Sequence, residues 1–245
     1  MENKNFYDAA SSFYDQMISF EKNLETRKAA FHKLFPNPGS AADLGCGSGV
    51  DSIALAMNGH SVLSVDPSTK MIELAKTNSE KYSQNLSFHK STIAAIPPKY
   101  DGKFYYVISL GNTFANVEGT TIYSTIQRLF DLLVEGGTCL IHILNYSLIM
   151  DQQERIVNIK PGEENYYVRF YDFISGQINF NILKFSQNDP KQYELISTRV
   201  FGYKKDLLAK TFDSVGFKEL KYWSDLDATK FNIATSKDLF IHAVK

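Results

Sequence analysis

The sequence has little charge imbalance, few cysteines and no long apolar run. Its 245 residues carry a formal net charge of −1, so it lacks the basic excess that binds nucleic acid or an anionic membrane. The N-terminus has no basic stretch followed by an apolar one, and no run of about 18 apolar residues occurs. We therefore expect a cytoplasmic protein whose partner is a small molecule, with no nucleic acid and no membrane involved.

The cysteines and histidines of the sequence do not indicate a metal site or a redox pair. The two cysteines, Cys46 and Cys139, are isolated, and the five histidines show no metal-binding spacing such as HExxH. Isolated cysteines suit a reducing compartment, where they behave as small buried hydrophobes. We expect no metal site, and the sequence leaves a homo-oligomer open.

Strands and helices alternate from about residue 40 to 145. Expected strands are 41–44, 61–66, 86–91, 103–110 and 138–144, and helical spacing follows the first, second and fourth of them. The helix from Ile122 is expected to end at Gly136-Gly137. Repeated βα units imply right-handed crossovers and a parallel sheet with helices on both faces. The predicted fold class is therefore α/β, doubly wound and Rossmann-like.

Two regions depart from this alternation. Residues 1–38 read as one or two helices, which we expect to form an N-terminal cap. Residues 151–203 read as a meander of three antiparallel strands, 165–173, 178–185 and 193–203, inserted after the fifth strand. The main domain is predicted to comprise 39–150 and 204–245, with a helix stopping at Gly216 and two closing strands.

The stretch "DLGCGSG", residues 43–49, joins the first strand to a helix. Glycines there let a backbone approach a ligand beyond the carboxyl ends of the strands. Asp66 closes the second strand, where a carboxylate can accept hydrogen bonds from both hydroxyls of a ribose. Strand, glycines and acid in this order predict a nucleoside-containing ligand.

The glycine spacing separates two classes of nucleoside ligand. A dinucleotide turn has G-x-G-x-x-G, whereas the sequence here is G-x-G-x-G with Val50 next and the acid Asp43 before it. A carboxylate at this turn would repel a pyrophosphate but can interact with the ammonium group of a methionine moiety. The pattern favours S-adenosylmethionine over NAD.

"DLGCGSG" resembles motif I of the class I S-adenosylmethionine-dependent methyltransferases, and the resemblance covers nearly the whole chain. "SVLSVDPSTKM", "LGNTFANV" after the fourth strand and "LNYSLI" after the fifth resemble the glycine and sarcosine N-methyltransferase group. The resemblance implies a seven-stranded sheet whose last strand is antiparallel, with the β insert covering the acceptor site.

At the methionine end of the cofactor, the resemblance implies contacts from backbone and one cation. Gly45, Cys46 and Gly47 would offer backbone atoms, and the Leu110 carbonyl would lie near the sulfonium. Arg27 resembles a helical arginine that pairs with the cofactor carboxylate.

At the nucleoside end, Asp66 would hold the ribose, as its position at a strand end also predicts. Pro67 and Met71 would flank the adenine. Thr92 would lie near the adenine amino group, where many relatives carry an acid.

For the acceptor site, the resemblance implies Asn112, Tyr14 and Tyr167. Asn112 matches an asparagine that helps to place a small amine. Leu144 stands where the glycine-specific relatives have an arginine for the acceptor carboxylate, and a leucine cannot make that pair. Glycine is thus a doubtful acceptor unless another arginine supplies the charge. Three arginines of the insert are candidates: Arg155, Arg169 and Arg199.

We hypothesise a methyltransferase that acts on a small molecule, by in-line displacement at an amine nitrogen. O-methylation and a non-catalytic S-adenosylmethionine-binding module stay open as alternatives. A nucleic-acid methyltransferase would ordinarily show an Asp-Pro-Pro-Tyr type of segment after the fourth strand, where this chain has "SLGNTF".

Overall fold

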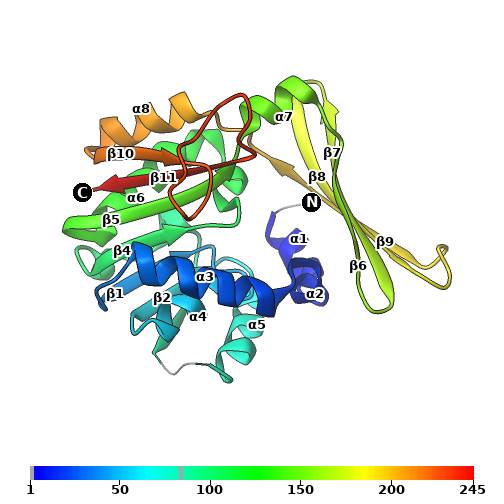
Figure 1. Cartoon of the computed structure of the whole chain (residues 1–245), viewed down its shortest axis with the longest axis horizontal. Helices are drawn as coiled ribbons and strands as arrows, with labels where there is room; N and C mark the ends of the chain where they lie inside the picture. The colour runs from blue at the N-terminus through cyan, green and yellow to red at the C-terminus, as the bar shows by residue number, and fades with distance from the viewer. Residues whose placement is uncertain (1–2, 83–84) are drawn as a thin grey trace.

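The computed structural model describes residues 3–82 and 85–245, and it contains two sheets and eight α-helices within those ranges (Figure 1). The larger sheet contains β1 (Ser40–Leu44), β2 (Ser61–Asp66), β3 (Leu86–Lys90), β4 (Phe104–Ser109), β5 (Leu133–Leu144), β10 (Lys218–Trp223) and β11 (Asp238–Val244). The smaller sheet contains β6 (Ile156–Pro161), β7 (Asn165–Ile174), β8 (Gln177–Ser186) and β9 (Tyr193–Val200). The helices are α1 (Asn3–Ala10), α2 (Tyr14–Ile18), α3 (Phe20–Leu34), α4 (Val50–Met57), α5 (Thr69–Ser79), α6 (Ile122–Leu132), α7 (Tyr146–Gln152) and α8 (Lys205–Val215).

The larger sheet has the strand order β10-β11-β5-β4-β1-β2-β3. The five strands β5, β4, β1, β2 and β3 are parallel to one another, and β11 runs antiparallel to both β5 and β10. The prediction of a doubly wound α/β sheet with an antiparallel last strand is confirmed. Because β1 lies between β2 and β4, the strand order reverses at β1, and ligands of such sheets bind beside that point.

Helices cover both apolar faces of this sheet. Helices α3 and α4 pack on one face around Leu24, Phe31 and Ile53, and helices α6 and α8 pack on the other around Ile126 and Phe212. β1 is almost wholly buried and β2 is exposed only at its first residue, as expected for parallel strands covered on both sides. This core fixes where the strand ends and the turns after them lie.

The antiparallel insert after β5 is confirmed, but it has four strands where the sequence predicted three. The additional strand, β6, pairs with β7 from Ile156 opposite Phe170 to Pro161 opposite Tyr166. It is a six-residue edge strand, mostly exposed although Ile156, Val157 and Ile159 are apolar, and it ends in a proline, so it gives no strong strand pattern. The short helix α7, which joins β5 to this sheet, was also missed.

Two expected boundaries were wrong. Helix α6 ends at Leu132, before Gly136-Gly137, and β5 begins at Leu133, five residues earlier than predicted. The expected one or two N-terminal helices are three, because Ser19 takes a left-handed conformation with φ +57° between α2 and α3.

Helices α1 and α2 lie between the two sheets (Figure 1). Phe6 of α1, Met17 of α2 and Phe13 between the two helices form one apolar cluster with Met71 of α5 and Ile196 of β9. The N-terminal residues therefore connect the carboxyl edge of the larger sheet with the smaller one. Within the described residues, no helix has both the length and the apolar character needed to cross a membrane.

Candidate active site

The turn after β1 has three glycines with left-handed backbones. The φ angles are +83° at Gly45, +53° at Gly47 and +91° at Gly49. The Gly45 and Cys46 amides donate to the Val65 carbonyl, at 2.7 and 3.0 Å. These bonds fasten the turn to the end of β2, so the two strand ends lie together.

The sequence predicted that these glycines let the backbone approach a ligand. In the structure, protein side chains lie near the position that a Cβ would take at each of the three. A Cβ at Gly45 would lie 2.6 Å from the Thr113 hydroxyl oxygen, and one at Gly49 would lie 3.0 Å from the Ala75 Cβ. At Gly47 the nearest other atoms belong to the Tyr14 ring, at 3.8 Å and beyond. Gly45 and Gly49 therefore serve internal packing, whereas a Cβ at Gly47 would meet the Tyr14 side chain only at ordinary van der Waals distance.

Asp66 lies at the end of β2 with only 8 % of its surface exposed. Its Oδ2 accepts from the Gly47 amide at 3.0 Å, and its Oδ1 accepts from the Ser68 amide at 2.8 Å. Burial raises the pKa of Asp66 to about 6, although both amides favour the ionised form. The carboxylate has about four lone-pair positions, so two remain for further donors.

Asp43 faces into the protein rather than toward the turn. Ser52 donates to its Oδ2 at 2.6 Å, and Ser64 donates in turn to Ser52 at 2.8 Å. Burial and the nearby Asp51 raise the pKa of Asp43 to about 8. Arg27 forms an ion pair with Asp51, with 3.2 Å between Nε and Oδ1.

The residues predicted near the adenine are dispersed. Met71 is fully buried in the apolar cluster that joins α1, α2 and the smaller sheet, whereas Pro67 is half-buried. Thr92 is exposed and begins a short 3-10 helix, where its carbonyl accepts from Ala95. The structure thus brings Met71 and Pro67 near the start of α5, while Thr92 lies at the end of β3.

One residue at this end was missed. Asp8 of α1 accepts from the Ser68 hydroxyl, and its Oδ1 lies 3.4 Å from the Lys70 amide. Ser68 itself caps α5, since its hydroxyl accepts from the Met71 amide at 3.0 Å. Nothing in the sequence near Asp8 signals this contact, because its partner is sixty residues away.

Past β4, Asn112 holds a left-handed backbone with φ +66°. Its side-chain amide donates to the Tyr146 hydroxyl at 2.9 Å, and its Oδ1 accepts from the Leu144 amide at 3.1 Å. The Leu110 carbonyl accepts from the Thr113 hydroxyl at 2.8 Å. The ends of β4 and β5 are thereby joined through Asn112.

Tyr14 and Tyr167 are placed differently. Tyr14 stands beside Gly47, and burial raises its pKa far above the ordinary value. Tyr167 is 1 % exposed, stacks on Phe13 at 5.5 Å between ring centroids, and donates to Gln16 at 2.9 Å. Tyr14 therefore adjoins the glycine turn, while Tyr167 packs between α2 and the smaller sheet.

Further tyrosines gather around Asn112. Tyr146 is 1 % exposed and shares a hydrogen bond with Tyr171 of β7. The Tyr7 hydroxyl accepts from the Asn116 side chain at 3.1 Å. Burial raises the pKa values of Tyr7 and Tyr171 to about 12, so these hydroxyls keep their protons at neutral pH.

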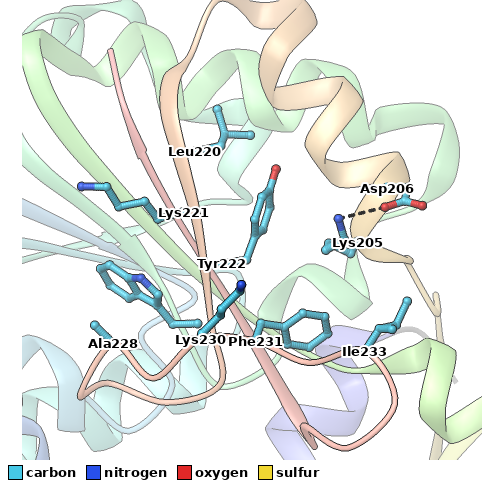
Figure 2. Close-up of a pocket in the computed structure, with 10 residues that line it drawn as sticks. Lys205, Asp206, Leu220, Lys221, Tyr222, Ala228, Lys230, Phe231 and Ile233 are labelled. Carbon is cyan, nitrogen blue, oxygen red and sulfur yellow. Dashed lines mark ion pairs between the residues drawn. The ribbon is translucent and has the colours of Figure 1, made fainter.

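Two surface recesses are lined by residues other than Asn112 and the tyrosines around it. The larger, about 720 Å³, opens beside β10 and is lined by Lys205, Tyr222, Lys230 and Phe231, none of them a predicted site residue (Figure 2). The other, about 500 Å³, is bordered by Arg27, the one predicted residue that lines either of them.

Several known proteins are similar to this chain in sequence. A family model described as "Methyltransferase domain" matches residues 41–137. The chain is 24% identical over 238 residues to a glycine/sarcosine N-methyltransferase from Aphanothece halophytica, covering 95% of this chain and 86% of that protein. It is 30% identical over 139 residues to glycine N-methyltransferase from Homo sapiens, covering 51% of this chain and 46% of that protein.

The fold has counterparts among solved structures. An S-adenosylmethionine-dependent methyltransferase from Clostridium acetobutylicum superposes with a TM-score of 0.77 at 15% identity, covering 97% of this chain and 98% of that one. At this identity the likeness concerns the fold. It extends over both sheets, because nearly the whole of each chain is aligned.

Proposed function

The chain belongs to the class I S-adenosylmethionine-dependent methyltransferases, and from that membership we propose that it methylates a small molecule at an amine nitrogen. The relatives named above support the nitrogen acceptor, since both are N-methyltransferases by name. The observation that carries the proposal is the meeting of Gly47, Asp66 and Asn112 at one sheet edge, after β1, β2 and β4.

The residues at this edge suit the cofactor. Asp66 is a buried carboxylate with two lone-pair positions left by the Gly47 and Ser68 amides, which matches the two hydroxyls of a ribose. Because Gly47 has no side chain, its backbone would approach the methionine part beside the Tyr14 ring. We propose the same role for Gly45, Cys46 and the Leu110 carbonyl.

Five other residues complete the proposed cofactor site. Pro67, Met71 and Thr92 would line the adenine. Arg27 and Asp43 would act on the methionine end, in each case through a group that already has a protein partner.

S-adenosylmethionine supplies a methyl group on a positive sulfur, so the protein needs no covalent intermediate. Asn112 and Tyr146 would orient the amine, because their mutual hydrogen bond fixes both side chains. Holding two reactants in line contributes effective molarities of roughly 10⁵ to 10⁸ M. Buried surroundings favour the neutral amine, whose lone pair is the nucleophile. The tyrosine hydroxyls keep their protons and would position the amine rather than accept its proton.

We further propose that residues 1–38 and 151–203 form the cover of the acceptor site. Helices α1 and α2 together with β7 to β9 enclose the apolar cluster beside Met71. Such a cover excludes water from the reacting atoms. Tyr14 would then line the site directly, and Tyr167 would act by fixing the position of α2 through Gln16.

The experiment has two stages. Calorimetry with S-adenosylhomocysteine tests cofactor binding, and incubation with methyl-labelled S-adenosylmethionine and a metabolite extract, followed by mass spectrometry, tests transfer. We expect saturable binding and label on a nitrogen. Binding with no labelled product would favour a non-catalytic module, and label on oxygen would contradict the nitrogen acceptor.

A further inference from the structure

Arg169 is a charged residue in the middle of the inner face of β7. Side chains alternate along a strand, so Tyr167, Arg169 and Tyr171 share one face. Tyr167 belongs to the apolar cluster with α1 and α2, and Tyr171 belongs to the core of the larger sheet. On the next strand, β8, Ile182 stands opposite Arg169. The guanidinium thus lies where the two apolar regions meet.

Its protein partners are neutral. The Arg169 Nε donates to the Asn158 Oδ1 of β6 at 2.8 Å. Among residues 3–82 and 85–245, no carboxylate forms an ion pair with it, whereas Arg155 pairs with Asp172 and Arg128 pairs with Asp101. Burial lowers the pKa of Arg169, which shows that the charged form has lost hydration.

A half-buried charge without an anionic partner costs folding free energy. The hydroxyls of Tyr14 and Tyr171 are close enough to favour the charged form of Arg169, but they are protonated and carry no negative charge. Two nitrogens of the guanidinium, Nη1 and Nη2, have no hydrogen bond to any described residue. The residue therefore suits an anion that comes from outside the chain.

Two neighbours of Arg169, Tyr14 and Tyr171, are each close to a residue of the proposed site. Tyr14 stands beside Gly47 of the glycine turn. Tyr171 bonds to Tyr146, whose hydroxyl accepts from Asn112. Arg169 therefore shares one face of β7 with Tyr171, and its charge acts on Tyr14 beside the glycine turn.

We propose that Arg169 binds a carboxylate of the methyl acceptor, so that the acceptor is an amino acid or another small amine with a carboxylate. A guanidinium pairs with a carboxylate through two parallel hydrogen bonds, which would fix the direction of the attached amine. Leu144, at the end of β5, supplies no charge for this task. This inference rests on the proposed function, and it adds the substrate class and the residue that selects it.

The other two arginines of the insert are less suited. Arg155 is 67% exposed at its side chain and is already paired with Asp172. Arg199 is exposed and lies over the Phe201 ring, with 4.9 Å between its guanidinium carbon and the ring centroid. Arg199 therefore provides a matched control on the same sheet.

The test uses pairs of amines that differ in the carboxylate, such as glycine with methylamine and β-alanine with ethylamine, alongside labelled products from a metabolite extract. We expect labelled products to carry a carboxylate. In Arg169→Gln, kcat/KM for them should fall about tenfold to a hundredfold, mostly through KM, because two charge-assisted hydrogen bonds are lost. Arg169→Lys should recover part of this, and Arg199→Gln should leave it unchanged.

Several results would overturn the inference. Label confined to amines without a carboxylate would refute it while the proposed function stood. Equal losses in Arg169→Gln for acceptors with and without a carboxylate would do the same. If no amine in any set accepted the methyl group, the proposed function would fall, and this inference with it.

A structural role for Arg169 makes a different prediction. Arg169→Met removes the charge and keeps an apolar stem. If the arginine serves binding, this variant should melt at the same or a higher temperature, since a half-buried charge is gone, and it should still bind S-adenosylhomocysteine. A clear fall in melting temperature together with unchanged KM would show that Arg169 supports the fold instead.

Discussion

The proposed site has two sides. On the first side, the turns after β1 and β2 hold Asp66 with backbone amides. On the second side, the smaller sheet and helices α1 and α2 contribute side chains from separate segments of the chain. On the first side, the Gly47 and Ser68 amides fix Asp66 within one βα unit and its neighbour. On the second, Arg169 comes from β7 and Tyr14 from α2, more than 150 residues apart in the chain. Backbone geometry is shared by a whole fold family, while side chains can change one at a time. The first side therefore suits a common cofactor and the second a particular acceptor.

The strongest test of this contrast is Asp66→Ala. The change removes the proposed acceptor of both ribose hydroxyls, so S-adenosylhomocysteine affinity should fall by about a hundredfold or more, roughly 3 kcal/mol for two hydrogen bonds to a charged group. Calorimetry measures it. Asp227→Ala, at an exposed carboxylate, is the matched control and should change nothing. Equal affinity in Asp66→Ala would remove the cofactor assignment from this side.

Gly45→Ala tests how far the turn depends on its backbone. A side chain there would meet Thr113 and would have to adopt φ +83°, so we expect a loss of about 2 to 4 kcal/mol in unfolding free energy. Gly102→Ala is the control, because φ is +60° there and the space is open. It should cost about 1 kcal/mol. Chemical denaturation of both variants separates crowding from backbone strain, and equal losses would mean that Thr113 moves aside.

The cofactor side should also respond to pH. The pKa of Asp66 is raised to about 6, so the carboxylate loses its charge as the pH falls below that value. Affinity for S-adenosylhomocysteine should therefore weaken from pH 7 to pH 5, approaching tenfold per unit below 6. Without ligand the sign reverses, because a raised pKa adds stability below about pH 4 that is lost as the pH rises through 6. Asp66→Asn should flatten both trends, and an unchanged profile would point to another group.

The smallest expected effect lies on the acceptor side. Tyr146→Phe removes the hydroxyl that accepts from Asn112, and we expect a loss of about 1 kcal/mol in stability together with a higher KM for the acceptor. S-adenosylhomocysteine affinity should not change. Tyr203→Phe, which removes a hydroxyl bonded to the Val117 carbonyl, controls for the loss of a buried hydrogen bond. A fall in cofactor affinity in Tyr146→Phe would show that the two sides are not separable.

The glycine turn after β1 and the position of Asp66 at the end of β2 could be predicted from the sequence, whereas the side chains that the second side brings together could not, for a physical reason. Glycines with positive φ and an acid at a strand end are local features, so "DLGCGSG" and Asp66 could be interpreted without a structure. β6 was missed because it is a short and largely exposed edge strand that ends in a proline. Arg169 was one of three candidate arginines, and the burial and partners that separate it from Arg155 and Arg199 depend on how distant strands pair, which the sequence does not reveal.

The contact of Asp8 with the start of α5 has a consequence for the rate of turnover. Helix α1 also packs against β9, so one short helix contacts both the smaller sheet and helix α5. A cofactor lying between Asp66 and Met71 would be enclosed by this helix, and we expect product to leave only after the bond between Asp8 and Ser68 breaks. The length of time for which each spent cofactor is retained would then depend on helix α1, and not on the chemistry of methyl transfer.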